Sequence, residues 1–367
     1  MRSIFLISIL GVFPALLAAQ AAPEIGVLNS AKFRIDVPAK WNGGLIVYCH
    51  GYSQRPGSFD DKPNALVSAF TDLGYAVAQS GYAAGGWAVK EGSEDTEQLR
   101  RYFISKYVSA ARPLKETFLM GHSMGGFLTM MSMERMAGTY KAGLALCGPL
   151  TSSTDFMNRG AFDGLVLFNY YFPGVLPEPD QMLKFQEWQG IETRVMAALQ
   201  GKPEAAETLR RFGGQKTLKD FASVLVFGAG MIREMTVRAG GLAFENADVV
   251  YTVEGDYNAV NTGVKRYRAD PKAAAYVASW YTPTGRLTAP MLAVHTTYDP
   301  LVPTSIPNRY IGLTRVSGSQ SLFVQQYVKH DGHCQITPAE TVNAFQELKR
   351  WADGGPAPVG GTVPAAP

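Results

Sequence analysis

The sequence predicts an α/β fold, with a mostly parallel central sheet flanked by helices and a mainly helical cap insertion. Apolar runs with the length of strands alternate with helical patterns up to residue 147 and again from residue 289 onward. Such alternation is typical of parallel sheets joined by crossover helices. The alternation lapses over residues 150–288, where helical patterns are separated by glycine-rich breaks.

The predicted elements follow in chain order. Residues 31–38 alternate apolar and polar side chains, as a half-exposed strand does. Residues 45–49 (LIVYC) are continuously apolar, which is typical of a strand buried on both faces of a parallel sheet. The remaining strands are expected at 75–79, 117–120, 142–147, 291–295 and 322–328, and the main helices at 63–73, 95–107 and 338–351.

These elements define the expected domains. Residues 22–149 and 289–352 form the core, and residues 150–288 form a cap or lid, because so long a connection cannot be structureless inside a compact domain. The alternative, extra elements packed on the sheet edge, stays open. Residues 353–367 are rich in Gly, Pro and Ala, so we expect a flexible tail.

The first residues have the features of a secretory signal peptide. Arg2 precedes a 15-residue apolar run, and small residues follow around Ala21. This pattern predicts a cleaved leader over residues 1–21, although an uncleaved anchor is the alternative. The mature protein is therefore expected to be secreted or periplasmic, with no stable membrane insertion after signal cleavage.

Composition excludes several partners. The net charge is +3 and no acidic or basic block occurs, so nothing favours a nucleic acid partner.

Three cysteines, Cys49, Cys147 and Cys334, allow at most one internal disulfide, and the sequence does not say which pair forms it. No His/Cys cluster has metal-ligand spacing, so no metal is expected.

The most informative motif is Gly121-His122-Ser123-Met124-Gly125, between an apolar strand and a Met/Leu-rich helix. This order is typical of a nucleophile elbow, in which the serine lies on a sharp strand-to-helix turn. Small residues are needed beside such a serine, and Gly121 and Gly125 provide them. The motif predicts Ser123 as a nucleophile.

A serine nucleophile needs a base to accept its proton and a carboxylate to orient that base. Of the five histidines, His333 lies in a loop after the last strand, preceded by a glycine, whereas His330 directly follows the strand and is better explained as a wall residue. Asp299 follows the strand at 291–295 and is the expected acid, the alternative being a structural turn aspartate.

The tetrahedral intermediate needs hydrogen-bond donors for its oxyanion. The backbone N–H of Met124, directly after the nucleophile, is one expected donor. The loop after the strand at 45–49 contains His50-Gly51-Tyr52. Gly51 allows the backbone to turn inward, so the Tyr52 N–H is the expected second donor and His50 braces the loop.

Together, the oxyanion loop, the elbow, Asp299 and His333 resemble the α/β-hydrolase family in residue type and in order. The resemblance implies an acyl-enzyme mechanism, with an insertion between the sixth and seventh core strands, and no cofactor. Two features differ from those of known subfamilies. Residue 122 is His, whereas tannase-like and feruloyl-esterase-like relatives have a cysteine there that pairs with a cysteine beside the catalytic histidine. The oxyanion loop is HGYS and not the HGGG of hormone-sensitive-lipase-like esterases.

Two aromatic groups are candidates for substrate binding. Tyr82 and Trp87 lie in a glycine-rich loop after the strand at 75–79 and would form a pocket rim, or the loop simply packs on its neighbours. In the predicted cap, Tyr170, Tyr171 and Phe172 invite the same interpretation, although an aromatic run is more often core.

The predicted function is an exported serine hydrolase that cleaves small-molecule or polymeric carboxylic esters without a metal or cofactor. A peptidase of the prolyl-oligopeptidase or aminopeptidase type is the alternative, and a non-catalytic binding protein on the same fold is a third hypothesis. Acyl and alcohol specificity and oligomeric state stay open at this point.

Overall fold

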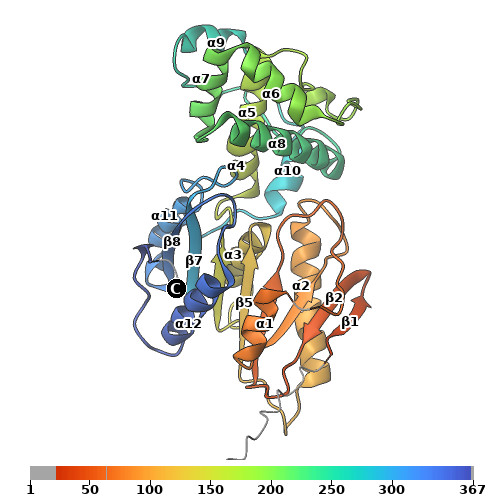
Figure 1. The fold of residues 1–367 in the computed structure, drawn as a ribbon, viewed down its shortest axis with the longest axis vertical. Coiled ribbons are helices and arrows are strands. Elements are labelled where there is room, and N and C mark those ends of the chain that lie inside the picture. The colour runs from red at the N-terminus through yellow and green to blue at the C-terminus, as the bar shows by residue number, and fades with distance from the viewer. Residues whose placement is uncertain (1–21, 63, 365–367) are drawn as a thin grey trace, which may run out of the picture.

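The computed structural model describes residues 22–62 and 64–364. The predicted leader, residues 1–21, lies outside the described residues, so its assignment stays a prediction. In the described part of the chain, nine strands form one sheet in the order β1-β2-β4-β3-β5-β6-β7-β8-β9. The pairs β1–β2 and β2–β4 are antiparallel, and every later pair is parallel (Figure 1).

The strands cover the segments that the sequence predicts, with one addition at each end of the sheet. Both additions, β1 and β9, are edge strands. The bounds are, in chain order, β1 (Glu24–Leu28), β2 (Ala31–Asp36), β3 (Gly44–Cys49), β4 (Ala76–Ser80), β5 (Glu116–His122), β6 (Ala142–Leu146), β7 (Met291–Tyr298), β8 (Phe323–Asp331) and β9 (Gly361–Thr362).

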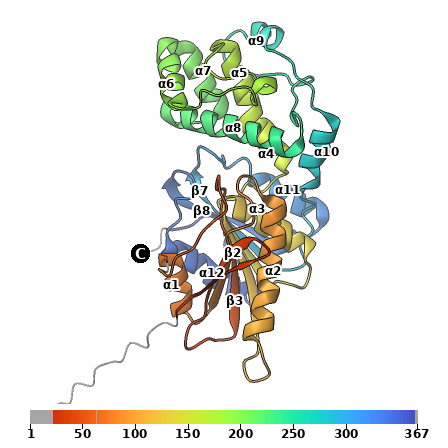
Figure 2. The same ribbon diagram turned by 90° about the vertical axis from the view of Figure 1, so that its right-hand side faces the viewer.

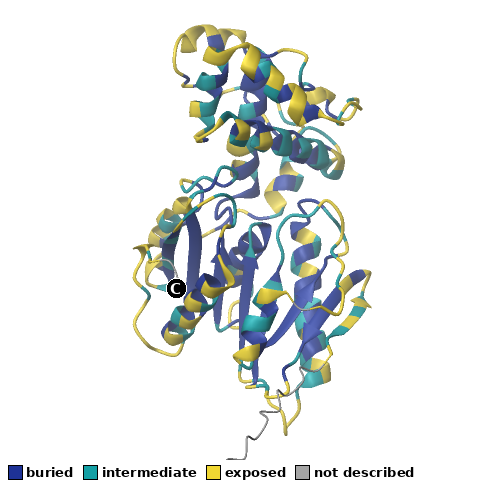
Figure 3. Ribbon diagram, viewed as in Figure 1, coloured by how far each residue is buried: buried dark blue, intermediate teal, exposed yellow. Residues whose placement is uncertain are grey.

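Helices cover both faces of the sheet, and the central strands are buried between them (Figure 3). Within β3, Leu45 and Val47 pack on one face, whereas Ile46 packs on the other. A strand buried on both faces needs the continuous apolar sequence seen here. The helices of the first face are α2 (Val89–Tyr107), α3 (Met124–Arg135) and α11 (Asn308–Ser317), and those of the second are α1 (Ala65–Asp72) and α12 (Pro338–Ala352).

All helices from α4 to α10 lie between β6 and β7, and we call them the helical insertion. They form a separate layer beyond the carboxyl ends of the parallel strands (Figures 1 and 2). The α/β class with a helical insertion is thus confirmed. The bounds are α4 (Ser153–Met157), a π-helical turn η1 (Asn158–Phe162), α5 (Asp163–Tyr171), a 3₁₀ turn η2 (Pro179–Gln181), α6 (Ile191–Gly201), α7 (Pro203–Gly213), α8 (Leu218–Ala239), α9 (Tyr257–Gly263) and α10 (Pro271–Ser279).

Helix α8 is the longest helix of the insertion, with 22 residues. Its first turn is capped by Thr217, whose side chain accepts a hydrogen bond from the N–H of Asp220. It ends at Gly240, whose φ of 74° is the left-handed conformation that favours glycine. No helix of the described chain is both long and apolar enough to cross a membrane.

The expectation of a flexible tail from residue 353 is wrong for residues 359–363. Gly361 and Thr362 pair with Gln326 and Tyr327 of β8 as a short parallel strand. The side chain of Gln326 also donates to the carbonyl oxygen of Val359 at 3.0 Å. Composition does not reveal this pairing, because the unpaired edge of β8 provides the partner. Residues 365–367 lie outside the described residues.

A buried ion pair links the antiparallel edge of the sheet to a neighbouring loop, and its removal is predicted to be costly. Arg34 contacts Asp36 at 2.7 Å and donates to the carbonyl oxygens of Asp60 and Lys62 at 2.6 and 2.8 Å. Arg34→Met leaves the Asp36 carboxylate buried without a counter-charge. We expect the free energy of unfolding to fall by about 3–5 kcal/mol in urea titrations.

Lys32→Met is the matched control, because Lys32 lies on the same strand with its side chain exposed. This control is expected to change the free energy of unfolding by less than about 0.5 kcal/mol. Equal losses in the two variants would contradict the importance of the buried pair.

Candidate active site

The turn between β5 and α3 holds Ser123 in a strained conformation. Ser123 has φ 55° and ψ −119°, a region that side-chain-bearing residues rarely adopt. A Cβ on Gly121 would come within 2.4 Å of the Gly125 carbonyl oxygen, and one on Gly125 within 2.0 Å of the Cys49 carbonyl oxygen. Both positions therefore require glycine, as the elbow motif predicts.

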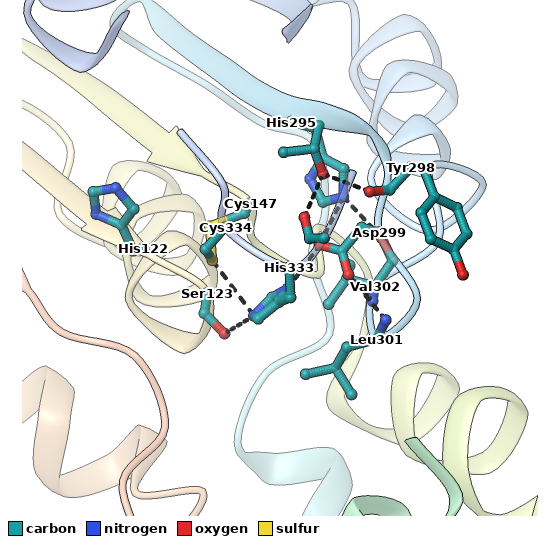
Figure 4. The surroundings of a disulfide bond; sticks show 12 residues. His122, Ser123, Cys147, His295, Tyr298, Asp299, Leu301, Val302, His333 and Cys334 are labelled. Atoms are coloured by element: carbon teal, nitrogen blue, oxygen red, sulfur yellow. Dashed lines mark hydrogen bonds and ion pairs between the residues drawn. A yellow bond between two sulfur atoms is a disulfide. The ribbon is translucent and has the colours of Figure 1, made fainter. Parts of the chain in front are cut away.

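The structure brings Ser123, His333 and Asp299 together at the carboxyl ends of the parallel strands (Figure 4). The distance from Ser123 Oγ to His333 Nε2 is 2.8 Å, and that from His333 Nδ1 to Asp299 Oδ2 is 2.7 Å. In the tautomer that satisfies both contacts, Nδ1–H donates to the carboxylate and Nε2 accepts from the serine hydroxyl. This is the geometry needed to transfer the serine proton to histidine.

Asp299 is buried and held by its own loop. Its Oδ1 atom accepts hydrogen bonds from the N–H groups of Leu301 and Val302, both at 2.9 Å. His295 lies beside it, with Nε2 3.5 Å from Asp299 Oδ2 and 2.8 Å from the Val302 carbonyl oxygen. Burial lowers the pKa of His295, which favours its neutral form. The carboxylate is thus oriented toward His333.

The other two histidines near the elbow have different partners. His122 points away from the Ser123–His333 contact (Figure 4), and its Nδ1 lies 3.1 Å from the Tyr48 hydroxyl. His330 contacts Glu340 instead, with His330 Nε2 and Glu340 Oε1 2.8 Å apart. The structure therefore places His333, and not His330, beside the serine.

The predicted oxyanion loop lies next to Ser123. A Cβ on Gly51 would come within 3.2 Å of Ser123 Cβ, so the backbone of this loop packs directly on the elbow. The His50 ring stacks on Tyr82 with ring centroids 3.9 Å apart. Met124 begins α3, where the first N–H groups have no partner within the helix. These positions leave the N–H groups of Met124 and Tyr52 as the candidate donors.

The expectation that Tyr82 and Trp87 form a pocket rim is not met. Tyr82 is fully buried, and its hydroxyl donates to the His50 carbonyl oxygen at 3.1 Å. Trp87 is also buried, and its indole N–H donates to Ser153 Oγ at 3.1 Å. Tyr82 thus packs against the oxyanion loop, and Trp87 packs against the start of the helical insertion. The alternative, a glycine-rich loop that packs on its neighbours, describes them better.

The aromatic run in the insertion also packs internally. Phe172 is buried and stacks on Phe168, with centroids 5.0 Å apart. Tyr170 covers Gly263 of α9, where a Cβ would come within 2.5 Å of the tyrosine ring. Tyr171 packs against Tyr170. The structure does not bring Tyr170, Tyr171 or Phe172 to Ser123, because the insertion needs these rings for its own core.

Helix α8, which contacts residues on both sides of the candidate site, is not among the helices predicted from the sequence. Near its start, Asp220 accepts a hydrogen bond from the Tyr298 hydroxyl at 2.8 Å, next to the Asp299 loop. Near its end, Glu234 accepts from the Tyr52 hydroxyl at 3.2 Å, on the oxyanion loop. Phe227 lies midway between them, and the seven-residue spacing puts all three on one helix face. This seven-residue spacing is visible in the sequence and would have indicated a helix with these three residues on one face.

Two clefts flank α8. Leu301, whose N–H donates to Asp299, lines a cleft of about 410 Å³. Tyr52 and Phe227 line a second cleft of about 650 Å³. A small cavity of about 10 Å³ shares Leu301 with the first cleft and Phe227 with the second. Within residues 22–62 and 64–364, no group of three or more His, Cys, Asp and Glu side chains is arranged to hold a metal ion.

A disulfide fixes the histidine loop. Cys334, directly after His333, is bonded to Cys147, which follows β6, while Cys49 is free and buried. Cys147 and Cys334 have φ values of 46° and 57°, so both backbones are held in the left-handed region. The pairing left open by the sequence is thus Cys147–Cys334, which ties the His333 loop to the sheet.

This disulfide predicts thiol counts and a loss of stability. A thiol titration in denaturant is expected to find one reactive thiol per chain before reduction and three after reduction. The Cys147→Ser/Cys334→Ser variant is expected to lose about 2–4 kcal/mol of unfolding free energy, because the unfolded chain is no longer cross-linked. In Cys49→Ala, the control, the bridge persists and no thiol is found before reduction. Two or three thiols in the unreduced wild type would refute the pairing.

The lowered pKa of His122 predicts that the folded protein loses stability in acid. Burial, with a contribution from the charge of His333, lowers the pKa of His122 from 6.5 to about 4. Between these values the unfolded chain binds a proton that the folded chain does not, so the free energy of unfolding falls as pH drops from 6.5 to 4. The loss attributable to His122 is on the order of 3 kcal/mol.

His122→Asn is expected to make the decline between pH 6.5 and 4 shallower in urea titrations. Part of the decline persists, because burial also lowers the pKa of His50 and of His295. Identical pH slopes in the variant and the wild type would contradict this assignment.

Several solved structures are similar to this chain at low sequence identity. Similar solved structures include the acylaminoacyl peptidase of Pyrococcus horikoshii (11% identity, TM-score 0.49, 92% of this chain and 42% of that one). Lipase A of Candida antarctica is also similar (15% identity, TM-score 0.47, 92% of this chain and 77% of that one). So is a rice cell wall degrading esterase of Xanthomonas oryzae (14% identity, TM-score 0.44, 88% of this chain and 83% of that one). This chain thus spans less than half the length of the peptidase. A search of curated proteins found no match.

The family comparison covers most of the chain. A family profile described as an alpha/beta hydrolase family matches residues 46–344. The matched segment begins in β3, includes the elbow and the whole helical insertion, and ends within α12. The chain belongs to the alpha/beta hydrolase family.

Proposed function

We propose that this protein is a serine hydrolase that cleaves carboxylic esters through Ser123, His333 and Asp299. The observation that carries the proposal is the continuous pair of contacts, 2.8 Å from Ser123 Oγ to His333 Nε2 and 2.7 Å from His333 Nδ1 to Asp299 Oδ2. A general base within hydrogen-bond distance activates the serine, and the buried carboxylate stabilises the imidazolium that forms.

The reaction follows from this arrangement. Ser123 Oγ attacks the ester carbonyl carbon while His333 Nε2 takes the serine proton. The N–H groups of Met124 and Tyr52 donate to the oxyanion, each contributing roughly 3–4 kcal/mol to the stability of the transition state. His333 then gives its proton to the alcohol oxygen, which leaves. Water, activated by the same histidine, releases the acid and restores Ser123.

Two further elements of the proposal concern the insertion and the cellular location. The helical insertion acts as a cap, since α8 contacts both the Asp299 loop and the oxyanion loop. Export to a secreted or periplasmic location is supported by the leader-like residues 1–21 and by the disulfide Cys147–Cys334. Disulfides persist mainly in oxidising compartments.

The test is Ser123→Ala with p-nitrophenyl acetate and p-nitrophenyl butyrate as substrates. We expect kcat to fall by about 10⁴-fold or more, because the variant lacks the hydroxyl that forms the acyl-enzyme. A circular dichroism spectrum and a melting temperature close to those of the wild type show that the fold is retained. Wild-type turnover that survives in Ser123→Ala would refute the proposal.

The same catalytic residues serve an amide bond, so esters are compared with aminoacyl p-nitroanilides. A kcat/KM at least tenfold higher on the esters is expected. Labelling of wild-type protein by a fluorophosphonate probe, lost in Ser123→Ala, separates an enzyme from a non-catalytic binding protein.

A further inference from the structure

The cleft of about 650 Å³ lies between one face of α8 and the oxyanion loop. The residues from α8 recur at helical spacing, so they form one continuous wall. The opposite wall belongs to the segment that begins at Tyr52 and to the glycine-rich loop at Gly85 and Gly86. Trp188, from the connection before α6, closes one side. The α8 residues are Val226, Phe227, Gly230, Arg233, Glu234, Val237 and Arg238.

Arg233 is the unexplained charge in this cleft. In the described chain its guanidinium forms no ion pair, and its Nε atom is buried without a hydrogen-bond partner. The neighbouring carboxylate of Glu234 is engaged elsewhere, because it accepts from the Trp87 N–H at 2.9 Å, from Arg238 at 2.6 Å and from the Tyr52 hydroxyl. Arg233 as a whole is half-buried, but a buried donor is normally paired, so its Nε atom lacks an acceptor among the described residues.

We propose that this cleft binds an anionic oxygen group of the substrate and that Arg233 is its partner. The inference rests on the proposed esterase function and names the substrate class: esters whose acid or alcohol part also carries a carboxylate or a phosphate. The planar guanidinium binds such groups through two parallel hydrogen bonds. Trp188 and Phe227 provide apolar surface for the part between the anion and the ester bond.

The position of the cleft connects it to the reaction. Tyr52 contributes to the wall of the cleft, and its backbone N–H is the candidate oxyanion donor beside Ser123. Arg233 directly precedes Glu234, which holds the Tyr52 hydroxyl. An ester with its carbonyl oxygen at the oxyanion loop therefore lies beside the cleft that Tyr52 and Arg233 both line.

Gly230 offers a way to block the cleft without disturbing the packing. It lies within α8, and a Cβ at this position meets nothing within 4 Å. Gly164 is the matched position in the other cleft, lining it in the same open manner. Gly230→Phe fills the proposed cleft, and Gly164→Phe fills the cleft beside Leu301.

The experiment measures the ratio of kcat/KM between charged and uncharged esters. One pair, p-nitrophenyl hemiglutarate and p-nitrophenyl valerate, varies the acid part. The other pair, 4-acetoxybenzoate and its methyl ester, varies the alcohol part. We expect the wild type to prefer the charged ester at least tenfold in one pair, and Arg233→Gln to lower that ratio about tenfold or more, because it loses a charge-assisted hydrogen bond.

Two controls make the result specific. Arg268→Gln removes an exposed arginine of the insertion that does not line the cleft, and it is expected to keep the wild-type ratio. Gly230→Phe is expected to lower kcat/KM for the preferred charged ester at least tenfold, whereas Gly164→Phe retains it. The absence of a preference in both pairs, or equal effects of Arg233→Gln and Arg268→Gln, overturns the inference while the Ser123-dependent turnover of uncharged esters stands.

Calorimetry with Ser123→Ala gives a readout that does not depend on turnover. Benzoate and inorganic phosphate are the two probes, and each is titrated into Ser123→Ala with and without Arg233→Gln. Tighter binding of benzoate assigns the site to carboxylates, and tighter binding of phosphate assigns it to phosphates. Binding that does not weaken at least tenfold in the double variant overturns the inference, even if no ester is ever found to be cleaved.

Discussion

Two backbone segments of the candidate site, at the end of β3 and at the start of α3, pack closely against each other. The carbonyl oxygen of Cys49, at the end of β3, occupies the space that a side chain at position 125 would need. The chain of β3 continues directly into His50 and Gly51, and Gly51 packs on Ser123. The close packing of β3 on the strained turn of Ser123 therefore also places the proposed oxyanion loop beside it. Ser123 and the loop that carries the proposed oxyanion donors thus lie together where β3, β5 and α3 pack.

Helix α8 connects the remaining parts of the site. Its contacts at Asp220 and Glu234 lie about four helical turns apart, on the loop that carries Asp299 and on the oxyanion loop. A rigid helix held at both ends keeps these two loops at a fixed separation. Between the two contacts Val224, Phe227 and Met231 line the small cavity of about 10 Å³. The insertion thus contacts the chain on both sides of the candidate site.

The features that the sequence predicts well are those that depend on local rules. The elbow around Ser123 requires glycines at fixed positions, and the strand at 45–49 is buried on both faces, so each is visible in a few residues. The position of Asp299 and His333 follows from chain order at the ends of strands. Because all parallel strands end at one edge of the sheet, order along the chain becomes proximity in space.

Features that depend on contacts between residues far apart in the sequence could not be predicted from local patterns. Tyr82 is buried because His50, distant in sequence, stacks on it, and residues 361–362 pair with β8 because that edge is free. The choice of Cys147 as the partner of Cys334 rests on a Cα separation of 5.2 Å across 187 residues. Arg233 gave no signal at all, since only the surrounding cleft reveals its missing acceptor.

The disulfide has a topological consequence. Cys147 lies before the first helix of the insertion, and Cys334 lies after both Asp299 and His333, so the bond encloses the entire insertion in a covalent ring. Proteolytic nicking at an exposed loop of the insertion would leave both fragments joined. The nicked chain would separate on a denaturing gel only after reduction, and the histidine loop would remain attached to the end of β6. In a protease-rich surrounding, this ring preserves the connectivity of the site after the first cut.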